Sequence, residues 1–411
     1  MKSLLKNLSL ALFSLLFTLA MLEIAARVFH LGTGGFWEPH PLYGWRNIPN
    51  ADGWESCYGE CAVHVKINSR GLRDEEIPYE KAEGEKRILL LGDSMTAGMQ
   101  VPLADTFGEQ LEDYLNQWDN ENQWTVVNGA VNGFGTDNEL IFYREEGIKY
   151  QPDIVLVGVY LANDIYNNSR VLELRTGGQS HKPYFTLTET GELELHNFPA
   201  ENTDTLFIRI GSFLKKHFQL PRFVAQTLNL RGEVPGWLRP IVSLFSGSRG
   251  VQQTKTASED EGENEQAKAS AGRTKEPTIC DAEYAPEIEE AWNITKAIIR
   301  QMRTEVEANG AQLAIVLIPT AAQVIPPKDG VSWYCERPNQ ELTAFLDEEG
   351  IPYLDMLQPF RDHMLAGGDT LYYKRDFHMN EGGHHLAGKL IADFVAESLL
   401  IPSGIQIGQQ N

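Results

Sequence analysis

A serine stands directly after a buried-type strand of this sequence. The run Ile88–Leu91 is aliphatic throughout, as in strands covered on both faces of a parallel sheet, and Gly92-Asp93-Ser94 follows it. The small residues after Ser94 predict a sharp turn into a helix, which places the hydroxyl at the carboxyl edge of the sheet. This pattern is typical of a nucleophilic serine, although an ordinary strand-to-helix turn capped by Ser94 or Thr96 has the same composition.

A carboxylate and an imidazole far along the chain can activate such a serine. Near neutral pH a serine hydroxyl needs an adjacent base, and Asp376 and His378 lie two residues apart just before a predicted helix. A carboxylate can fix the tautomer of an imidazole and stabilise its protonated form. Asp376 and His378 can therefore supply both roles, whereas we expect His384 and His385, inside the helix, to be packing or surface residues.

Two further strand ends carry groups that can stabilise negative charge on an oxygen. The loop 129–135 contains three glycines, whose N–H groups can approach a ligand without a side chain in the way. A buried-type strand at 154–160 leads to Asn163, whose amide can donate to an oxyanion. A plain strand-to-helix turn and an Asx-turn are the alternative interpretations of these two segments.

These four segments, in this order, resemble the SGNH (GDSL-type) hydrolase superfamily. The resemblance implies that Ser94 is the nucleophile, that His378 is the general base and that Asp376 orients His378. It also implies an oxyanion hole formed by the backbone N–H groups of Ser94 and Gly133 and by the side chain of Asn163.

The resemblance covers residues 86–160 and 283–398 and leaves two details open. Gly129 and Gly135 compete with Gly133 for the oxyanion role. One residue separates the aspartate from the histidine, where many members have two, and this Asp-x-His-x-Asn form resembles the membrane-anchored bacterial branch that includes the alginate-acetylation proteins.

The order of predicted elements favours an α/β fold. Strands are predicted near residues 88, 126, 155, 314 and 353, and each is followed by a helix or an insertion, with long helices at Glu283–Asn309 and Glu381–Leu399. Such alternation predicts a flavodoxin-like three-layer sandwich with about five parallel strands. We assign residues 86–400 to this catalytic domain.

Two other regions accompany the predicted catalytic domain. Residues 31–85 predict a β-rich N-terminal collar, in which Arg70 and Arg73 are expected to form surface ion pairs rather than to bind an anionic substrate. Residues 165–280 predict a large insertion of packed amphipathic helices, with a substrate lid or a membrane-facing surface as alternatives, and 246–278 within it predicts a disordered loop.

The N-terminal residues 1–30 predict a signal anchor or transmembrane helix. Lys2 and Lys6 precede the apolar run Leu8–Leu22, and no clean cleavage site follows, so an uncleaved anchor is favoured over a cleaved signal peptide. Either interpretation exports the domain. We expect a bacterial inner-membrane protein with one N-terminal anchor and its catalytic domain in the periplasm.

The four cysteines agree with export. An even number of cysteines predicts two disulfides, most economically Cys57–Cys61 and Cys280–Cys335, although three pairings are possible in principle. Metal binding by Cys57, Cys61 and His64 is a less favoured alternative because no fourth ligand is evident nearby.

The composition of the chain limits the kinds of partner that it is expected to bind. A net charge of −22 and a pI near 4.9 argue against nucleic acid and strongly anionic partners, and no phosphate loop, dinucleotide fingerprint or zinc motif predicts a cofactor or a metal.

We expect a serine esterase that works through an acyl-enzyme, and the resemblance implies O-acyl groups of envelope or extracellular carbohydrate as substrates. The alternatives are a carbohydrate O-acetyltransferase, a lipase or thioesterase, and a non-catalytic carbohydrate-binding assembly factor.

Overall fold

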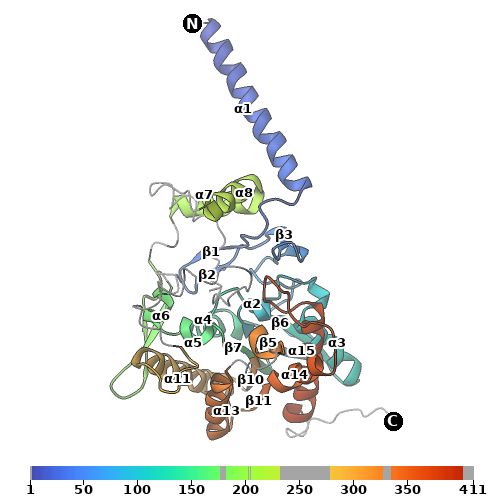
Figure 1. The fold of residues 1–411 in the computed structure, drawn as a ribbon, viewed down its shortest axis with the longest axis vertical. Helices are drawn as coiled ribbons and strands as arrows, with labels where there is room; N and C mark the ends of the chain where they lie inside the picture. Colours follow the sequence, from blue (N-terminus) through green and yellow to red (C-terminus); the bar gives the residue numbers. More distant parts are fainter. Residues whose placement is uncertain are drawn as a thin grey trace, which may run out of the picture.

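A parallel sheet forms the centre of the protein in a computed structural model that describes residues 2–175, 182–201, 203, 205–231, 278–326 and 335–400. The sheet has five strands in the order β11-β10-β7-β5-β6, which is the flavodoxin-like arrangement (Figure 1). Leu90 of β5, the second strand from one edge, pairs with Asn128 of β6 on one side and Leu156 of β7 on the other. The strands are β5 (Glu85–Gly92), β6 (Gln123–Asn128), β7 (Ile154–Tyr160), β10 (Gln312–Ile318) and β11 (Tyr353–Asp355).

Helices cover both faces of this sheet. Successive strand residues point to opposite faces, so the aliphatic runs feed two separate hydrophobic cores. One core includes side chains of α3 (Phe107–Trp118), α14 (Leu357–Leu365) and α15 (Glu381–Phe394), and the other includes those of α4 (Thr136–Glu145), α11 (Pro286–Ala308) and α13 (Arg337–Glu349). The predicted α/β three-layer fold is confirmed.

Short elements connect the strands to these helices. Gly92 ends β5 with φ +156°, and a Cβ on it would lie 2.2 Å from Thr96 Oγ1, so only glycine fits this tight turn. The connecting elements are α2 (Ser94–Ala97), η1 (Leu103–Asp105), η2 (Gly147–Tyr150), α5 (Asp164–Asn167), α6 (Arg170–Arg175) and α12 (Ala321–Val324), and the π-helical turn Val395–Leu400 follows α15.

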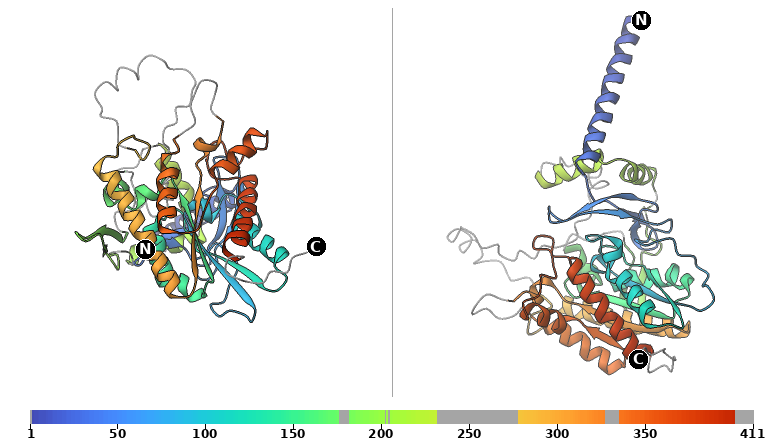
Figure 2. Two further views of the ribbon diagram at one scale, coloured as in Figure 1. Left: turned by 90° about the horizontal axis from the view of Figure 1, so that it is seen from below. Right: turned by 90° about the vertical axis from the view of Figure 1, so that its right-hand side faces the viewer.

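Two antiparallel hairpins precede the sheet in the chain. They pair β1 (Trp37–His40) with β2 (Gly44–Asn47) and β3 (Asp52–Ser56) with β4 (Ala62–Lys66). We call these four strands and the turns between them, residues 37–66, the collar. In Figures 1 and 2 the collar lies between the parallel sheet and the N-terminal helix α1 (Lys2–Val28). Residues Ser3–Val28 of α1 are long and apolar enough to cross a membrane.

The segment between β7 and α11 contains both helices and strands. It includes the antiparallel pair β8 (Tyr184–Leu187) and β9 (Leu193–His196), followed by α7 (Leu206–His217) and α8 (Leu220–Arg231). The predicted disordered loop 246–278 lies outside the described residues except at its last position. The strands β8 and β9 were not predicted, because four-residue strands carry too short a pattern to separate from a loop.

The four cysteines form the two predicted disulfides. Cys57 bonds to Cys61 and Cys280 bonds to Cys335, with Cα atoms 4.9 Å and 5.8 Å apart. Because the sulfurs of Cys57 and Cys61 are bonded to each other, they are not available to bind a metal together with His64.

Candidate active site

The fold brings Ser94, His378 and Asp376 into one chain of hydrogen bonds. Ser94 begins α2 at the carboxyl end of β5, and its Oγ lies 2.8 Å from His378 Nε2. On the other side of the ring, His378 Nδ1 lies 2.5 Å from Asp376 Oδ1. In the tautomer that satisfies both contacts, Nδ1–H donates to Asp376 and Nε2 accepts from the Ser94 hydroxyl.

A tight loop holds Asp376 and His378 on the same side. Phe377 between them has φ +65°, a left-handed conformation that is uncommon for an aromatic residue and turns the chain sharply. The Tyr373 N–H donates to the His378 carbonyl oxygen at 2.9 Å and closes the loop. After it, Asn380 caps α15 by accepting the Gly383 N–H at 3.0 Å.

The environment of the imidazole favours its protonated form. Burial alone would lower the pKa of His378, but the hydrogen bond and negative charge of Asp376, with the charge of Asp93, outweigh burial and raise this pKa above its ordinary value. Only 7% of His378 is exposed, whereas Ser94 is half-buried and so remains open to a substrate.

Glu60 of the collar holds the loop that carries the histidine. Its carboxylate accepts the backbone N–H groups of Lys374 at 3.0 Å, Arg375 at 2.7 Å and Asp376 at 3.3 Å. Glu60 itself sits inside the small ring closed by the Cys57–Cys61 disulfide. Glu60 was not predicted as a site residue, because more than 300 residues separate it from its partners; its place between two cysteines is the one local signal.

A hydrogen bond to Asp93 holds the side chain of Asn163 near Ser94. Its Nδ2 donates to Asp93 Oδ2 at 3.2 Å, and an amide nitrogen carries a second hydrogen that can point to a substrate oxygen. Asp93 is fully buried, and its Oδ1 accepts the Met95 N–H at 2.8 Å to cap α2. Burial raises the pKa of Asp93. One carboxylate therefore fixes both Asn163 and the helix that begins with the serine.

The three glycines of the loop 129–135 differ in whether their N–H groups are engaged. The Gly129 N–H donates to the Leu90 carbonyl oxygen at 2.8 Å, and the Gly135 N–H donates to Asn138 Oδ1 at 3.4 Å. Within the described part of the chain, the Gly133 N–H donates to no acceptor, and φ +78° there suits glycine. The geometry thus favours Gly133 as the backbone donor.

Arg73 binds carbonyl oxygens at the end of α2, the short helix that begins with Ser94, rather than forming a surface ion pair. Only 1% of Arg73 is exposed, and its guanidinium donates to the carbonyl oxygens of Ala97 at 2.9 Å and of Gly98 and Val101. Five donors in a rigid fork suit this capture of several carbonyls, so the surface prediction for Arg73 was wrong. The guanidinium of Arg70, by contrast, lies 4.1 Å from the ring centre of Tyr79.

The other histidines of α15 take structural positions, as predicted. His384 is buried and accepts the Phe107 N–H at 3.2 Å, and burial lowers its pKa to about 3, so it stays neutral. His385 contacts Gln110 Oε1 at 2.8 Å and the Tyr114 hydroxyl at 3.1 Å.

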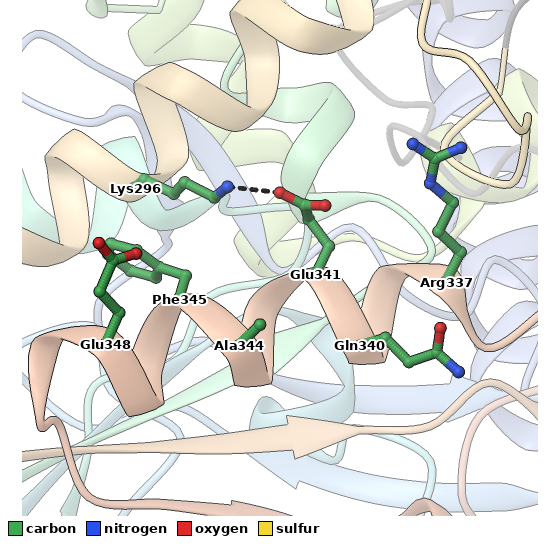
Figure 3. Close-up of a pocket in the computed structure, with 7 residues that line it drawn as sticks. All are labelled: Lys296, Arg337, Gln340, Glu341, Ala344, Phe345 and Glu348. Carbon is green, nitrogen blue, oxygen red and sulfur yellow. Dashed lines mark hydrogen bonds and ion pairs between the residues drawn. The ribbon is translucent and has the colours of Figure 1, made fainter.

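A surface hollow of about 390 Å³ lies elsewhere, between α11 and α13 (Figure 3). An ion pair between Lys296 and Glu341, 2.5 Å apart, bridges the two helices there. No serine, cysteine or histidine lines this hollow, so it offers no nucleophile and base. Among the described residues, no group of three or more metal-ligating side chains is placed to hold a metal ion.

The comparisons with known sequences agree with the predicted resemblance. Residues 280–411 match a family model described as SGNH hydrolase-like domain, acetyltransferase AlgX. An arylesterase from Vibrio mimicus is 32% identical over 76 residues, which are 18% of this chain. The chain spans 37% of the length of that relative.

Several solved structures are similar at low identity. A GDSL-like lipase from Bacteroides thetaiotaomicron is 11% identical, with 78% of this chain and 92% of that chain covered and a TM-score of 0.33. An acetylxylan esterase from Geobacillus stearothermophilus is 10% identical, with 75% and 94% covered and a TM-score of 0.38. A two-domain esterase active on acetylated mannans is 9% identical, with 80% and 53% covered and a TM-score of 0.37.

The resemblance to the SGNH hydrolases rests on the sequence matches and not on these distant structures. The family model includes Asp376 and His378, the two residues on which the predicted resemblance partly rested. The chain therefore resembles the SGNH hydrolases, as its motifs predicted, and its residues 280–411 match their SGNH hydrolase-like domain directly.

Proposed function

We propose that the protein is a serine esterase that works through an acyl-enzyme on Ser94. The hydrogen-bonded chain from Ser94 through His378 to Asp376 carries this proposal. It supplies a nucleophile, a base within reach of it and a carboxylate that orients the base, which is the arrangement nucleophilic serine catalysis requires.

The first half-reaction forms the acyl-enzyme. Ser94 Oγ attacks the carbonyl carbon of the ester while His378 Nε2 takes the hydroxyl proton. The oxyanion that develops lies toward the N–H groups of Ser94 and Gly133 and the free amide hydrogen of Asn163. When the intermediate collapses, the bond to the alkoxy group breaks and His378 returns the proton to the leaving alcohol.

The second half-reaction releases the acyl group. His378 takes a proton from a water molecule, whose oxygen attacks the acyl carbon, and the carboxylic acid leaves as Ser94 recovers its proton. Asp376 keeps the Nδ1–H in place during both steps and stabilises the imidazolium.

The proposed substrates are O-acyl groups, above all acetyl groups, on carbohydrate outside the cytoplasm. The acetyltransferase description of the matching family supports an acetyl group. Two disulfides and an apolar N-terminal helix preceded by Lys2 and Lys6 support export and one inner-membrane anchor with the site in the periplasm.

Transfer of the acyl group to a sugar hydroxyl is the second candidate. The matching family is described as an acetyltransferase, and both reactions share the same acyl-enzyme. They differ in whether water or a hydroxyl group attacks the acyl carbon. We retain hydrolysis as the proposal because a Ser-His-Asp site open to solvent admits water without any further group.

The test follows both products at once. The purified full chain in detergent is incubated with p-nitrophenyl acetate and acetylated or free oligosaccharides, and free acetate and acetylated sugar are measured by mass spectrometry. We expect acetate to be released faster than acetylated sugar forms. Faster sugar acetylation would replace hydrolysis by transfer, and failure to label with a serine-reactive phosphonate would contradict enzymatic function altogether.

A further inference from the structure

The helix α7 presents its apolar side chains outward. Leu206 is 74% exposed, Ile210 50% and Phe213 57%, and these residues share one face at helical spacing. On the opposite face, Lys215 is only 4% exposed. The helix is therefore amphipathic, but the side turned toward the protein is the one that carries the buried lysine.

Polar contacts fix this orientation. Lys215 Nζ donates to the Trp37 carbonyl oxygen of the collar at 3.0 Å and lies 5.0 Å from the centre of the Trp37 ring. Lys216 Nζ donates to the Pro49 carbonyl oxygen at 2.9 Å. Because α7 is tied to the collar through its lysines, its apolar face is left without a protein partner among the described residues.

The helices α7 and α8 are hydrogen-bonded to the C-terminal end of α1. The Glu23 carboxylate accepts the N–H groups of Gln219 at 3.0 Å and Leu220 at 2.9 Å, where α7 gives way to α8. Arg27 donates to the His217 carbonyl oxygen at 2.6 Å. Figures 1 and 2 show α7 and α8 lying across the direction of α1 at its foot, on the side of the collar away from the parallel sheet.

We infer that the apolar face of α7, formed by Leu206, Phe207, Ile210 and Phe213, lies in the surface of the lipid bilayer that α1 crosses. This inference rests on the membrane anchoring in the proposed function. A helix with one apolar face and lysines on its other side, lying crosswise at the end of a membrane span, matches the physical description of an interfacial helix. Lipid is the occupant because Arg27 binds the end of α7 at His217, and the neighbouring Val28 of the membrane-spanning helix is 65% exposed.

Docking of α7 on the bilayer would set the orientation of the domain, and so of the candidate active site, relative to the membrane. An anchor of one helix leaves the attached domain free to tilt, whereas a second contact with the bilayer restricts that motion. In Figure 1 the helix α2, which begins with Ser94, lies at the end of the sheet nearest the collar. Docking of α7 would therefore hold the nucleophile on the membrane-facing side of the domain, toward substrates close to the bilayer.

The experiment places a probe on this face in the full chain. All four native cysteines are in disulfides, so a single new cysteine can be labelled selectively. Phe213→Cys carries an environment-sensitive nitrobenzoxadiazole label in vesicles of phosphatidylcholine and phosphatidylglycerol containing spin-labelled lipid. The matched control is Leu365→Cys, which is 63% exposed and lies on α14; Figure 1 shows this helix beside the parallel sheet, with the collar between it and α7.

We expect the label at position 213 to be quenched by spin-labelled lipid several-fold more than the label at position 365. Equal quenching at the two positions overturns the inference, as does protection of position 213 from both lipid and aqueous quenchers, which would indicate a protein partner. An alkaline carbonate wash separates the two proposals, because loss of the chain from the vesicles contradicts the anchor itself. Turnover of p-nitrophenyl acetate by both labelled variants tests the proposed catalysis separately.

Discussion

The imidazole of His378 sets the pH at which the proposed site can work. A general base must be neutral to accept the proton of Ser94, and the surroundings raise the pKa of His378 above its usual value near 6.5. Activity should therefore increase as the pH rises through this raised pKa and stay low beneath it.

Asp376→Asn tests this dependence. Loss of the negative charge removes the contact that raises the pKa, so the midpoint of the pH profile of kcat/KM should fall, while kcat drops by roughly 10⁴-fold because the imidazole tautomer is no longer held. The measurement is turnover of p-nitrophenyl acetate between pH 5 and 9. An unchanged midpoint would show that Asp376 does not act on His378.

Asn163→Ala tests the proposed oxyanion donor. Removing one preorganised donor should lower kcat by about 10²–10³-fold with little change in KM, since the amide is expected to bind the transition state more strongly than the substrate. Thermal unfolding controls for the lost contact with Asp93. A variant that folds normally and keeps the wild-type kcat would remove Asn163 from the oxyanion hole.

Single residues show how far the site was predictable. Ser94, Asp376 and His378 carried local motifs, so the sequence alone could nominate them. Glu60 and Arg73 could not be found in this way, because each acts on backbone groups of a segment distant in the chain. A side chain that binds a backbone N–H or carbonyl leaves no residue-type signature at the other end of the contact.

Glu60 of the collar binds the loop that carries His378. We expect Glu60→Gln to lower kcat roughly 10-fold, because hydrogen bonds to a charged carboxylate contribute about 1.5–3 kcal/mol each and the loop would lose part of its support. Its pH profile should also shift, since the distance between His378 and Asp376 depends on this loop. Glu83→Gln is the matched control on an exposed position.

A purely structural role for Glu60 would give a different result. In that case thermal stability would fall, but kcat and the pH midpoint of the folded fraction would match those of the wild-type protein. The two outcomes are separated by measuring active-site concentration with a serine-reactive phosphonate before each assay.

The long helices and the strands of the parallel sheet were predicted, whereas the short strands β8 and β9 were not. All five strands of the sheet were predicted, including β11 with only three residues, and the helix predicted over Glu283–Asn309 was found at Pro286–Ala308. The predicted helix Glu381–Leu399 was found as α15 followed by a π-helical turn. For α7 the periodicity indicated an amphipathic helix, but which face is buried depends on Trp37 and Pro49, far away in the sequence.

The two disulfides should stabilise the protein unequally. Cys280–Cys335 closes a loop with a sequence separation of 55 and Cys57–Cys61 one of 4. In the chain-entropy model the longer loop contributes about 4 kcal/mol and the shorter about 2 kcal/mol to the free energy of unfolding. Denaturant unfolding of the two double Cys→Ser variants measures the difference, and a larger loss from the short loop would contradict the expectation.

In the proposed reaction the acyl group of the substrate is bound covalently to Ser94 before it is released. The most direct measurement is to mix the full chain with p-nitrophenyl acetate, stop the reaction in acid after a few turnovers and map the acetylated peptide by mass spectrometry. We expect one acetyl group on Ser94, none in Ser94→Ala, and slower formation in His378→Ala. Acetate release at the wild-type rate by folded Ser94→Ala, or an acetyl group that maps to another residue, would contradict this reaction.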